Sequence, residues 1–125
     1  LHLGFLSPEE VLKCIANADV VVVPSLCYEN SPTVIYEALS VGVPLLASRI
    51  GGVGELITEG KTGYLFTPGD ENDFLRLLKL MNDEKESFSA KAEEMRETVA
   101  SYDLSLYTER LITACTEAIA QVRPE

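Results

Sequence analysis

The chain has 125 residues, 46% of them hydrophobic, which suits one compact domain with its own core and leaves no room for two. Its formal net charge is −10, and this acidity argues against nucleic acid and anionic membranes as partners, because both select basic surfaces. A small nucleotide is not excluded, since it needs only a local electropositive spot. Acidity of this size also has a simpler interpretation, which is solubility.

The cysteines are Cys14, Cys27 and Cys115, an odd number with no CxxC spacing. We therefore expect neither a disulfide framework nor a zinc site. Cys14 and Cys115 fall on the apolar sides of expected helices and are predicted to be small core residues. The sequence shows no signal peptide and no apolar run long enough to cross a bilayer. Together these features predict a cytoplasmic protein.

The first part of the chain alternates between strand and helix patterns. Leu1–Phe5 is typical of a strand already under way, so we expect the chain to be a fragment of a longer protein. Ser7 and Pro8 then begin a helix, and Glu10 completes a capping box. Val20–Val23 follows as a buried, β-branched strand.

A second helix is predicted from Ser31-Pro32 to about Val41, and the elements after it continue the alternation. Strands are expected at residues 44–48 and 63–66, with a brief helix between them, and helices around residues 74–81, 85–100 and 106–119. Uniformly apolar strands that alternate with helices predict an α/β fold with a parallel sheet and helices on both faces. Residues 1–70 would form this alternating core and residues 71–125 a helical tail.

In open α/β sheets, ligands bind beyond the carboxyl ends of the strands, often at the amino terminus of a helix. Most expected helix starts carry acids that already satisfy the helix dipole, namely Glu9, Glu10, Glu55, Asp70, Glu71 and Asp73. The helix at Ser31-Pro32 carries none in its first turn, so Thr33 and Val34 offer open amides. This helix start is the best candidate anion site in the chain. The alternative is that Ser31 merely caps the helix.

Glu29 and Glu37 are the only charged residues between Asp19 and Arg49. Carboxylates are rarely buried without a partner, so both invite a functional explanation. The alternative is a pair of solvated or distantly paired acids.

Glu37 follows Thr33 by four residues and Val34 by three, which puts it on the same side of the helix as the open amides. One helical turn rises about 5.4 Å, which is of the order that separates the phosphates of a nucleotide from its ribose diol. A carboxylate has two acceptor oxygens and can bind both ribose hydroxyls. Glu29 precedes the helix, where the group beyond the phosphates would lie.

An ordered series of residues resembles the group 1 family (family 4) of retaining glycosyltransferases. It consists of Pro24-Ser25, Glu29-Asn30-Ser31-Pro32, Glu37 to Pro44, Ala47 to Gly52, Glu55, Gly60 to Leu65 and Pro68-Gly69-Asp70. The resemblance covers about the first 75 residues. Many members have Gly-Phe-Gly after the first glutamate, where this chain has Asn30-Ser31-Pro32, and this departure leaves the sugar unassigned.

The resemblance implies a GT-B enzyme with two facing Rossmann-like domains, of which this chain is part of the carboxy-terminal, donor-binding one. It implies that Glu37 binds the ribose and that Glu29, the candidate catalytic residue, lies beside the transferred sugar. The diphosphate and the sugar hydroxyls would meet the backbone of Asn30, Ser31, Pro32, Thr33 and Val34. Phe5 and Leu6 would touch the base.

The resemblance also implies the partners. The donor would be a UDP-, GDP- or ADP-linked sugar, the acceptor is not indicated, and the amino-terminal domain and the basic residues that neutralise the diphosphate would lie upstream. Any peripheral contact with a membrane would be made by that upstream half. No DxD motif occurs, so no metal or other cofactor is expected, and Arg49, the nearest cation, is expected to face solvent.

Two other functions stay open at this point. One is a nucleotide-sugar epimerase built on the same two-domain fold. The other is a non-catalytic domain fragment that only folds or binds a partner.

Overall fold

The computed structural model describes residues 1–100, 102 and 104–122, so residues 101, 103 and 123–125 of the predicted helical tail lie outside the described residues. The strands are β1 (Val21–Val23), β2 (Leu45–Ser48) and β3 (Gly63–Phe66), and they form one parallel sheet in the order β1-β2-β3. Val22 pairs with Leu46 and Leu46 with Tyr64. Short apolar strands of this kind are typical of a sheet covered on both faces, and the predicted parallel sheet is confirmed.

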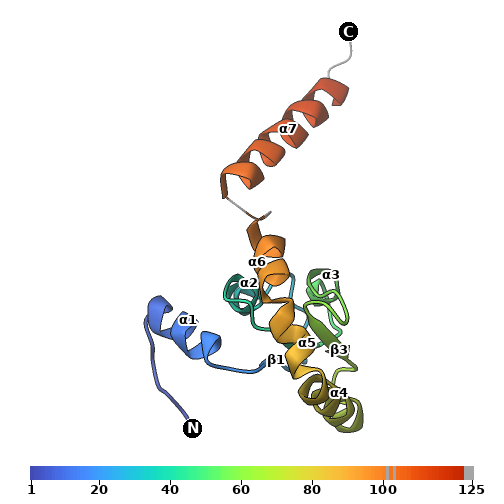
Figure 1. Cartoon of the computed structure of the whole chain (residues 1–125). Helices are drawn as coiled ribbons and strands as arrows, with labels where there is room; N and C mark the ends of the chain where they lie inside the picture. The colour runs from blue at the N-terminus through green and yellow to red at the C-terminus, as the bar shows by residue number, and fades with distance from the viewer. Residues whose placement is uncertain (101, 103, 123–125) are drawn as a thin grey trace.

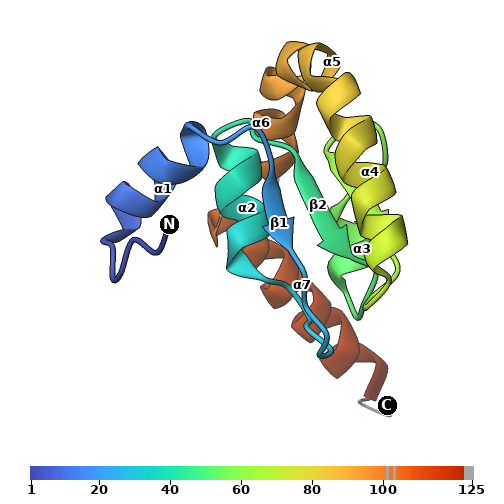
Figure 2. The same ribbon diagram turned by 90° about the horizontal axis from the view of Figure 1, so that it is seen from below.

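Helices alternate with the strands and then continue alone. They are α1 (Pro8–Ala16), α2 (Thr33–Ser40), α3 (Val53–Leu56), α4 (Glu71–Asp83), α5 (Lys85–Ala90), α6 (Ala92–Ala100) and α7 (Leu104–Val122). Figure 2 shows the sheet between α2 on one side and α4 on the other, which confirms the expected helices on both faces. At the start of α1, Ser7 and Glu10 form the predicted capping box.

Helix α2 packs on the core and against α6. Its side chains Ile35, Ala38 and Leu39 are buried, and α6 packs against it with the fully buried Met95. Gly42 ends this region with φ 77°, and a Cβ added there would lie 2.9 Å from the Cβ of Ala92. The glycine therefore gives both a left-handed turn and room for the approach of α6.

The opposite face of the sheet is covered by α4 and α5 through aromatic contacts. Phe66 of β3 packs edge-on against Phe74, with 5.2 Å between ring centroids, and Tyr64 packs edge-on against Phe88. The Tyr64 hydroxyl donates to Oε2 of Glu84 at 2.8 Å, and this hydrogen bond raises the pKa of the tyrosine. The helices after residue 70 up to α6 are thus part of the packed body.

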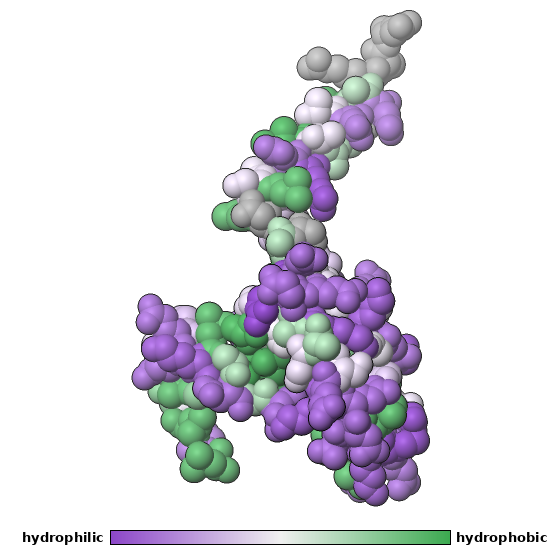
Figure 3. Space-filling view, viewed as in Figure 1, coloured by the Kyte–Doolittle hydropathy of each residue, from purple (hydrophilic) through white to green (hydrophobic). Residues whose placement is uncertain are grey.

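Helix α7 extends away from the body (Figure 1). Figure 3 shows hydrophobic residues along it, and its exposed apolar side chains are Leu104, Tyr107, Leu111, Ile112 and Ile119. In the part of the chain that the structure describes, no helix is long and apolar enough to span a membrane.

Several local expectations were wrong. Leu1–Phe5 forms no strand, because a strand needs a neighbour and none of the described strands pairs with it. Cys14 and Cys115 are exposed rather than buried: on α1 the buried residue is Ile15, and Cys115 lies on the projecting α7. The predicted helix over residues 85–100 is divided into α5 and α6 at Lys91.

The packing of α6 on α2 generates a first prediction. Replacing Met95 by alanine removes a fully buried side chain, and we expect the free energy of unfolding to fall by about 2–5 kcal/mol. Urea unfolding followed by circular dichroism measures this change. Leu75→Ala on α4, where the leucine is half exposed, is the control and should cost about 0.5 kcal/mol or less. Equal losses in the two variants would contradict the assignment of Met95 to the core.

Candidate functional site

The start of α2 lies just beyond the carboxyl end of β1, where ligands of open α/β sheets bind. Pro32 is the N-cap, with φ −61° and ψ 125°, no side chain caps the helix, and its first turn holds no acidic residue. Ile35 N–H donates to the Pro32 carbonyl at 3.1 Å. Among the described residues, no acceptor is found for the amides of Thr33 and Val34. Both amides therefore remain at the positive end of the helix dipole, as the sequence predicted.

Ser31 does not cap the helix, and the alternative that it does so is wrong. Its Oγ lies 2.6 Å from the Tyr36 hydroxyl oxygen and forms a hydrogen bond there. The serine side chain is thus directed to a residue one turn further along α2, while the proline that follows it occupies the cap position without a hydroxyl to offer.

Glu29 is half-buried in the loop before α2, and its carboxylate has a defined neighbour. Its Oε1 accepts a hydrogen bond from Ser25 Oγ at 2.9 Å, and Cys27 Sγ lies 4.0 Å from the same oxygen. The other carboxylate oxygen, Oε2, has no hydrogen-bond partner among the described residues. Ser25 thus fixes one side of the carboxylate and leaves the other side for a ligand.

The loop around Glu29 is also held through its backbone. Gly52 N–H donates to the Glu29 carbonyl at 2.9 Å. A Cβ on Gly51 would lie 2.3 Å from that carbonyl oxygen, and a Cβ on Gly52 would lie 2.2 Å from the carbonyl oxygen of Asn30. Only glycine fits at these two positions, because the turn after β2 packs backbone to backbone on the loop after β1.

Glu37 lies one turn inside α2 and is half-buried. The side chains of Ile35, Ala38 and Leu39 face the core, so Glu37 lies on the other side of the helix, four residues after Thr33. Neither Glu37 nor Glu29 forms an ion pair within the described ranges. The two glutamates thus stand before and after the open amides along the chain.

The residues predicted to touch the base are less well placed. Phe5 is fully exposed, so its side chain contacts nothing else in the described chain, and Leu6 is half-buried before α1. Arg49 pairs with Glu59 at 2.6 Å and stays exposed, in agreement with the expectation that it faces solvent. The base contact of Phe5 and Leu6 stays a prediction.

Sequence reasoning gave no role to Ser25, Tyr36, Gly51 and Gly52. The signal available for the glycines was two of them in succession two residues after a buried strand, which indicates a tight turn or a close backbone approach. The sequence holds no comparable signal for the Tyr36 hydroxyl, because its contact with Ser31 depends on the direction in which the loop enters α2.

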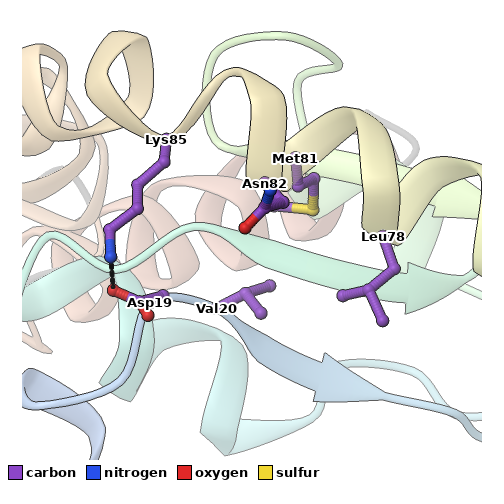
Figure 4. Close-up of a pocket in the computed structure, with 6 residues that line it drawn as sticks. All are labelled: Asp19, Val20, Leu78, Met81, Asn82 and Lys85. Carbon is purple, nitrogen blue, oxygen red and sulfur yellow. Dashed lines mark ion pairs between the residues drawn. The ribbon is translucent and has the colours of Figure 1, made fainter.

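Two of the pockets among the described residues lie away from the start of α2. One is at the amino end of β1, where the Lys85 ammonium pairs with Asp19 at 2.8 Å and Leu78 faces Val20 (Figure 4). The other lies on the α4 side of the sheet and is lined by Val22, Pro24, Leu26, Phe66, Gly69, Asp70, Glu71 and Phe74. Residues 29–37 line neither of these two, but Tyr36 lines a third pocket together with Tyr102, Leu104, Tyr107 and Arg110. Within the described residues, no group of three or more His, Cys, Asp and Glu is placed to hold a metal ion.

A parallel sheet covered by helices on both faces, with an uncapped helix just beyond a strand, defines a Rossmann-like α/β domain. Solved GT-B structures share this fold. Sucrose-phosphate synthase from Thermosynechococcus elongatus matches with a TM-score of 0.79 and 26% identity, over 93% of this chain and 30% of that one. Anabaena HepE in complex with UDP matches with a TM-score of 0.69 and 25% identity, over 85% of this chain and 29% of that one.

Sequence comparisons agree with the fold. The family model described as "Glycosyl transferases group 1" matches residues 1–101. Sulfoquinovosyl transferase from Arabidopsis thaliana is 35% identical over 111 residues, which are 86% of this chain and 22% of that protein. Glycogen synthase from Mycobacterium tuberculosis (strain H37Rv) is 32% identical over 99 residues, 79% of this chain and 24% of the enzyme. The chain belongs to the group 1 glycosyltransferases and corresponds to their carboxy-terminal domain, and it spans about a quarter of the length of these relatives.

The glycine contact generates a second prediction. Gly52→Ala brings a Cβ to 2.2 Å from the Asn30 carbonyl oxygen, so loop and turn must move apart. We expect the free energy of unfolding to fall by about 1–3 kcal/mol, with amide chemical-shift changes at Glu29 and Asn30. Gly54→Ala in α3 is a matched control, because its Cβ would meet nothing within 4 Å and alanine favours a helix. A loss of stability in Gly54→Ala as large as that in Gly52→Ala would contradict the explanation.

Proposed function

We propose that this chain binds the donor in a glycosyltransferase that moves a sugar from a nucleotide sugar to an acceptor with retention of anomeric configuration. The observation that carries the proposal is the acid-free, uncapped start of α2, with the open amides of Thr33 and Val34 between Glu29 and Glu37. The structure of Anabaena HepE in complex with UDP, which has a similar fold, supports a nucleotide as the ligand. The family match favours transfer over the epimerase alternative.

In the proposed complex the donor diphosphate lies at the start of α2 and accepts hydrogen bonds from the backbone of residues 30–34. Negative charge builds up on the departing nucleoside diphosphate during transfer, and fixed amides at a helix start stabilise such charge without reorganising. The helix end supplies the positive potential, so the proposal requires no metal ion.

The two glutamates have different proposed roles. Glu37 accepts hydrogen bonds from the ribose hydroxyls through both carboxylate oxygens. Glu29, held on one side by Ser25, directs its second oxygen to the hydroxyls of the transferred sugar and positions it for reaction. A hydrogen-bonded carboxylate in this place orients the sugar; the proposal does not require it to attack the anomeric carbon.

Calorimetric titration with UDP-, GDP- and ADP-sugars tests the proposal. The chain spans about a quarter of its relatives' length, so we expect weak or no binding by the chain alone. A full-length protein that carries this chain should bind one of the three donors with a micromolar Kd. It should also transfer the sugar with retention when the product is analysed by NMR. If that protein bound none of these nucleotide sugars, the proposal would be wrong.

The ribose role of Glu37 generates a separate prediction. Glu37→Gln replaces a charged acceptor, and hydrogen bonds to charged groups are worth about 1.5–3 kcal/mol, so donor affinity should fall roughly 10- to 100-fold. A donor that lacks the ribose hydroxyls should bind wild type and variant equally. Glu55→Gln, at the exposed start of α3, is the matched control and should keep wild-type affinity. If Glu37→Gln weakened the binding of both donors equally, with and without the ribose hydroxyls, Glu37 would not contact the ribose.

A further inference from the structure

We propose that Tyr36 is a positioning residue of the donor site: its hydroxyl holds the Ser31 side chain away from the first turn of α2 and so keeps the Thr33 amide open to the ligand. This inference rests on the proposed function. It concerns a contact found in the described structure, the hydrogen bond of 2.6 Å between Ser31 Oγ and the Tyr36 hydroxyl oxygen.

The two residues occupy defined positions at the helix start. Pro32 is the N-cap and Thr33 the first helical residue, so Ser31 is at N′ and Tyr36 at N4. In many helices an apolar pair at N′ and N4 packs together and sets the direction in which the chain enters the helix, an arrangement known as the hydrophobic staple. Here a hydroxyl–hydroxyl hydrogen bond connects the same two positions, and we call it the polar staple.

The polar staple matters because Ser31 has another partner within reach along the chain. A serine hydroxyl readily accepts a hydrogen bond from the amide two residues further on, in an ST-turn. For Ser31 that amide belongs to Thr33, one of the two open amides of the candidate site. An ST-turn there would satisfy the amide internally and compete with an incoming phosphate oxygen.

The Tyr36 ring has a contact of its own that is separate from its hydroxyl. The Tyr36 ring packs edge-on against Tyr102, with 5.1 Å between centroids and 73° between planes. Tyr36 is half-buried, so its ring has contacts that do not depend on the hydroxyl. Tyr36→Phe therefore keeps the ring packing and removes only the bond to Ser31, which separates the positioning role from a purely structural one.

Amide hydrogen exchange in the chain, without any ligand, tests the polar staple directly. In Tyr36→Phe the released Ser31 hydroxyl accepts from the Thr33 N–H, and we expect exchange of that amide to slow about fivefold or more. Tyr64→Phe is the matched control: it removes a tyrosine hydroxyl bonded to Glu84 on the opposite face of the sheet and should leave Thr33 exchange unchanged. Thr33 exchange within twofold of wild type in a folded Tyr36→Phe would overturn the proposal.

Binding of UDP to a full-length protein that carries the chain supplies the second readout. Tyr36→Phe should weaken binding about three- to tenfold when Ser31 is present, and less than twofold in a Ser31→Ala background, where no hydroxyl can occupy the amide. Equal weakening in both backgrounds would mean that the Tyr36 hydroxyl acts independently of Ser31 and would overturn the positioning role. If UDP, GDP and ADP all fail to bind, the proposed function fails, and the exchange experiment still decides the polar staple.

Discussion

The backbone contact between the turn at Gly51-Gly52 and the loop at Glu29-Asn30 determines where the candidate site lies. The Gly52 amide donates to the Glu29 carbonyl at 2.9 Å, and no side chain fits between the two segments. β1 and β2 are parallel neighbours, so the segments that leave their carboxyl ends meet at one edge of the sheet. The exit of β2 thus fixes the loop that follows β1, and with it the first glutamate and the approach to α2.

Helix α2 combines a firmly packed body with an unsatisfied start. A missing side-chain cap costs a helix about 1 kcal/mol. That cost is offset by the burial of Ile35, Ala38 and Leu39 and by the approach of α6, which the absence of a side chain at Gly42 allows. Because these contacts stabilise the helix, the helix does not depend on hydrogen bonds from its first amides, and these remain free for a ligand. The uncapped end is therefore compatible with a short helix of eight residues.

The sequence alone was sufficient to predict an element or a site where the pattern of residues is local and strong. Val20–Val23 and Pro44–Ala47 are uniformly apolar and short, and each is bounded by turn residues, a pattern that favours buried parallel strands. The acid-free first turn of α2 was equally visible, because it depends only on which residues follow Pro32. The roles of Glu29 and Glu37 are still predictions, since the residues around a carboxylate do not identify the ligand that it binds.

Features that depend on a partner elsewhere were not predictable. Leu1–Phe5 has a strand pattern, yet no described strand lies beside it, and an isolated strand cannot satisfy its hydrogen bonds. Cys115 has a helical, apolar setting in the sequence, but burial needs a second surface and α7 projects from the body. The Ser31 hydroxyl had two partners within reach, a backbone amide and a phenol, and only the three-dimensional course of the loop selects between them.

The overall charge of −10 and the proposed anionic ligand are compatible because electrostatic interactions at the surface are short-ranged. At physiological salt the screening length is about 8 Å, so acids on distant helices contribute little to the field at the start of α2. Glu29 and Glu37 are closer along the chain, since they precede and follow the open amides. They would repel an extended run of phosphates, but they fit a ligand whose diphosphate is flanked by hydroxyl-bearing groups. A nucleotide sugar has this order of groups, with a ribose on one side of the diphosphate and a sugar on the other. Under the proposed function, the order of acids and open amides along this helix start therefore suits such a donor better than nucleic acid.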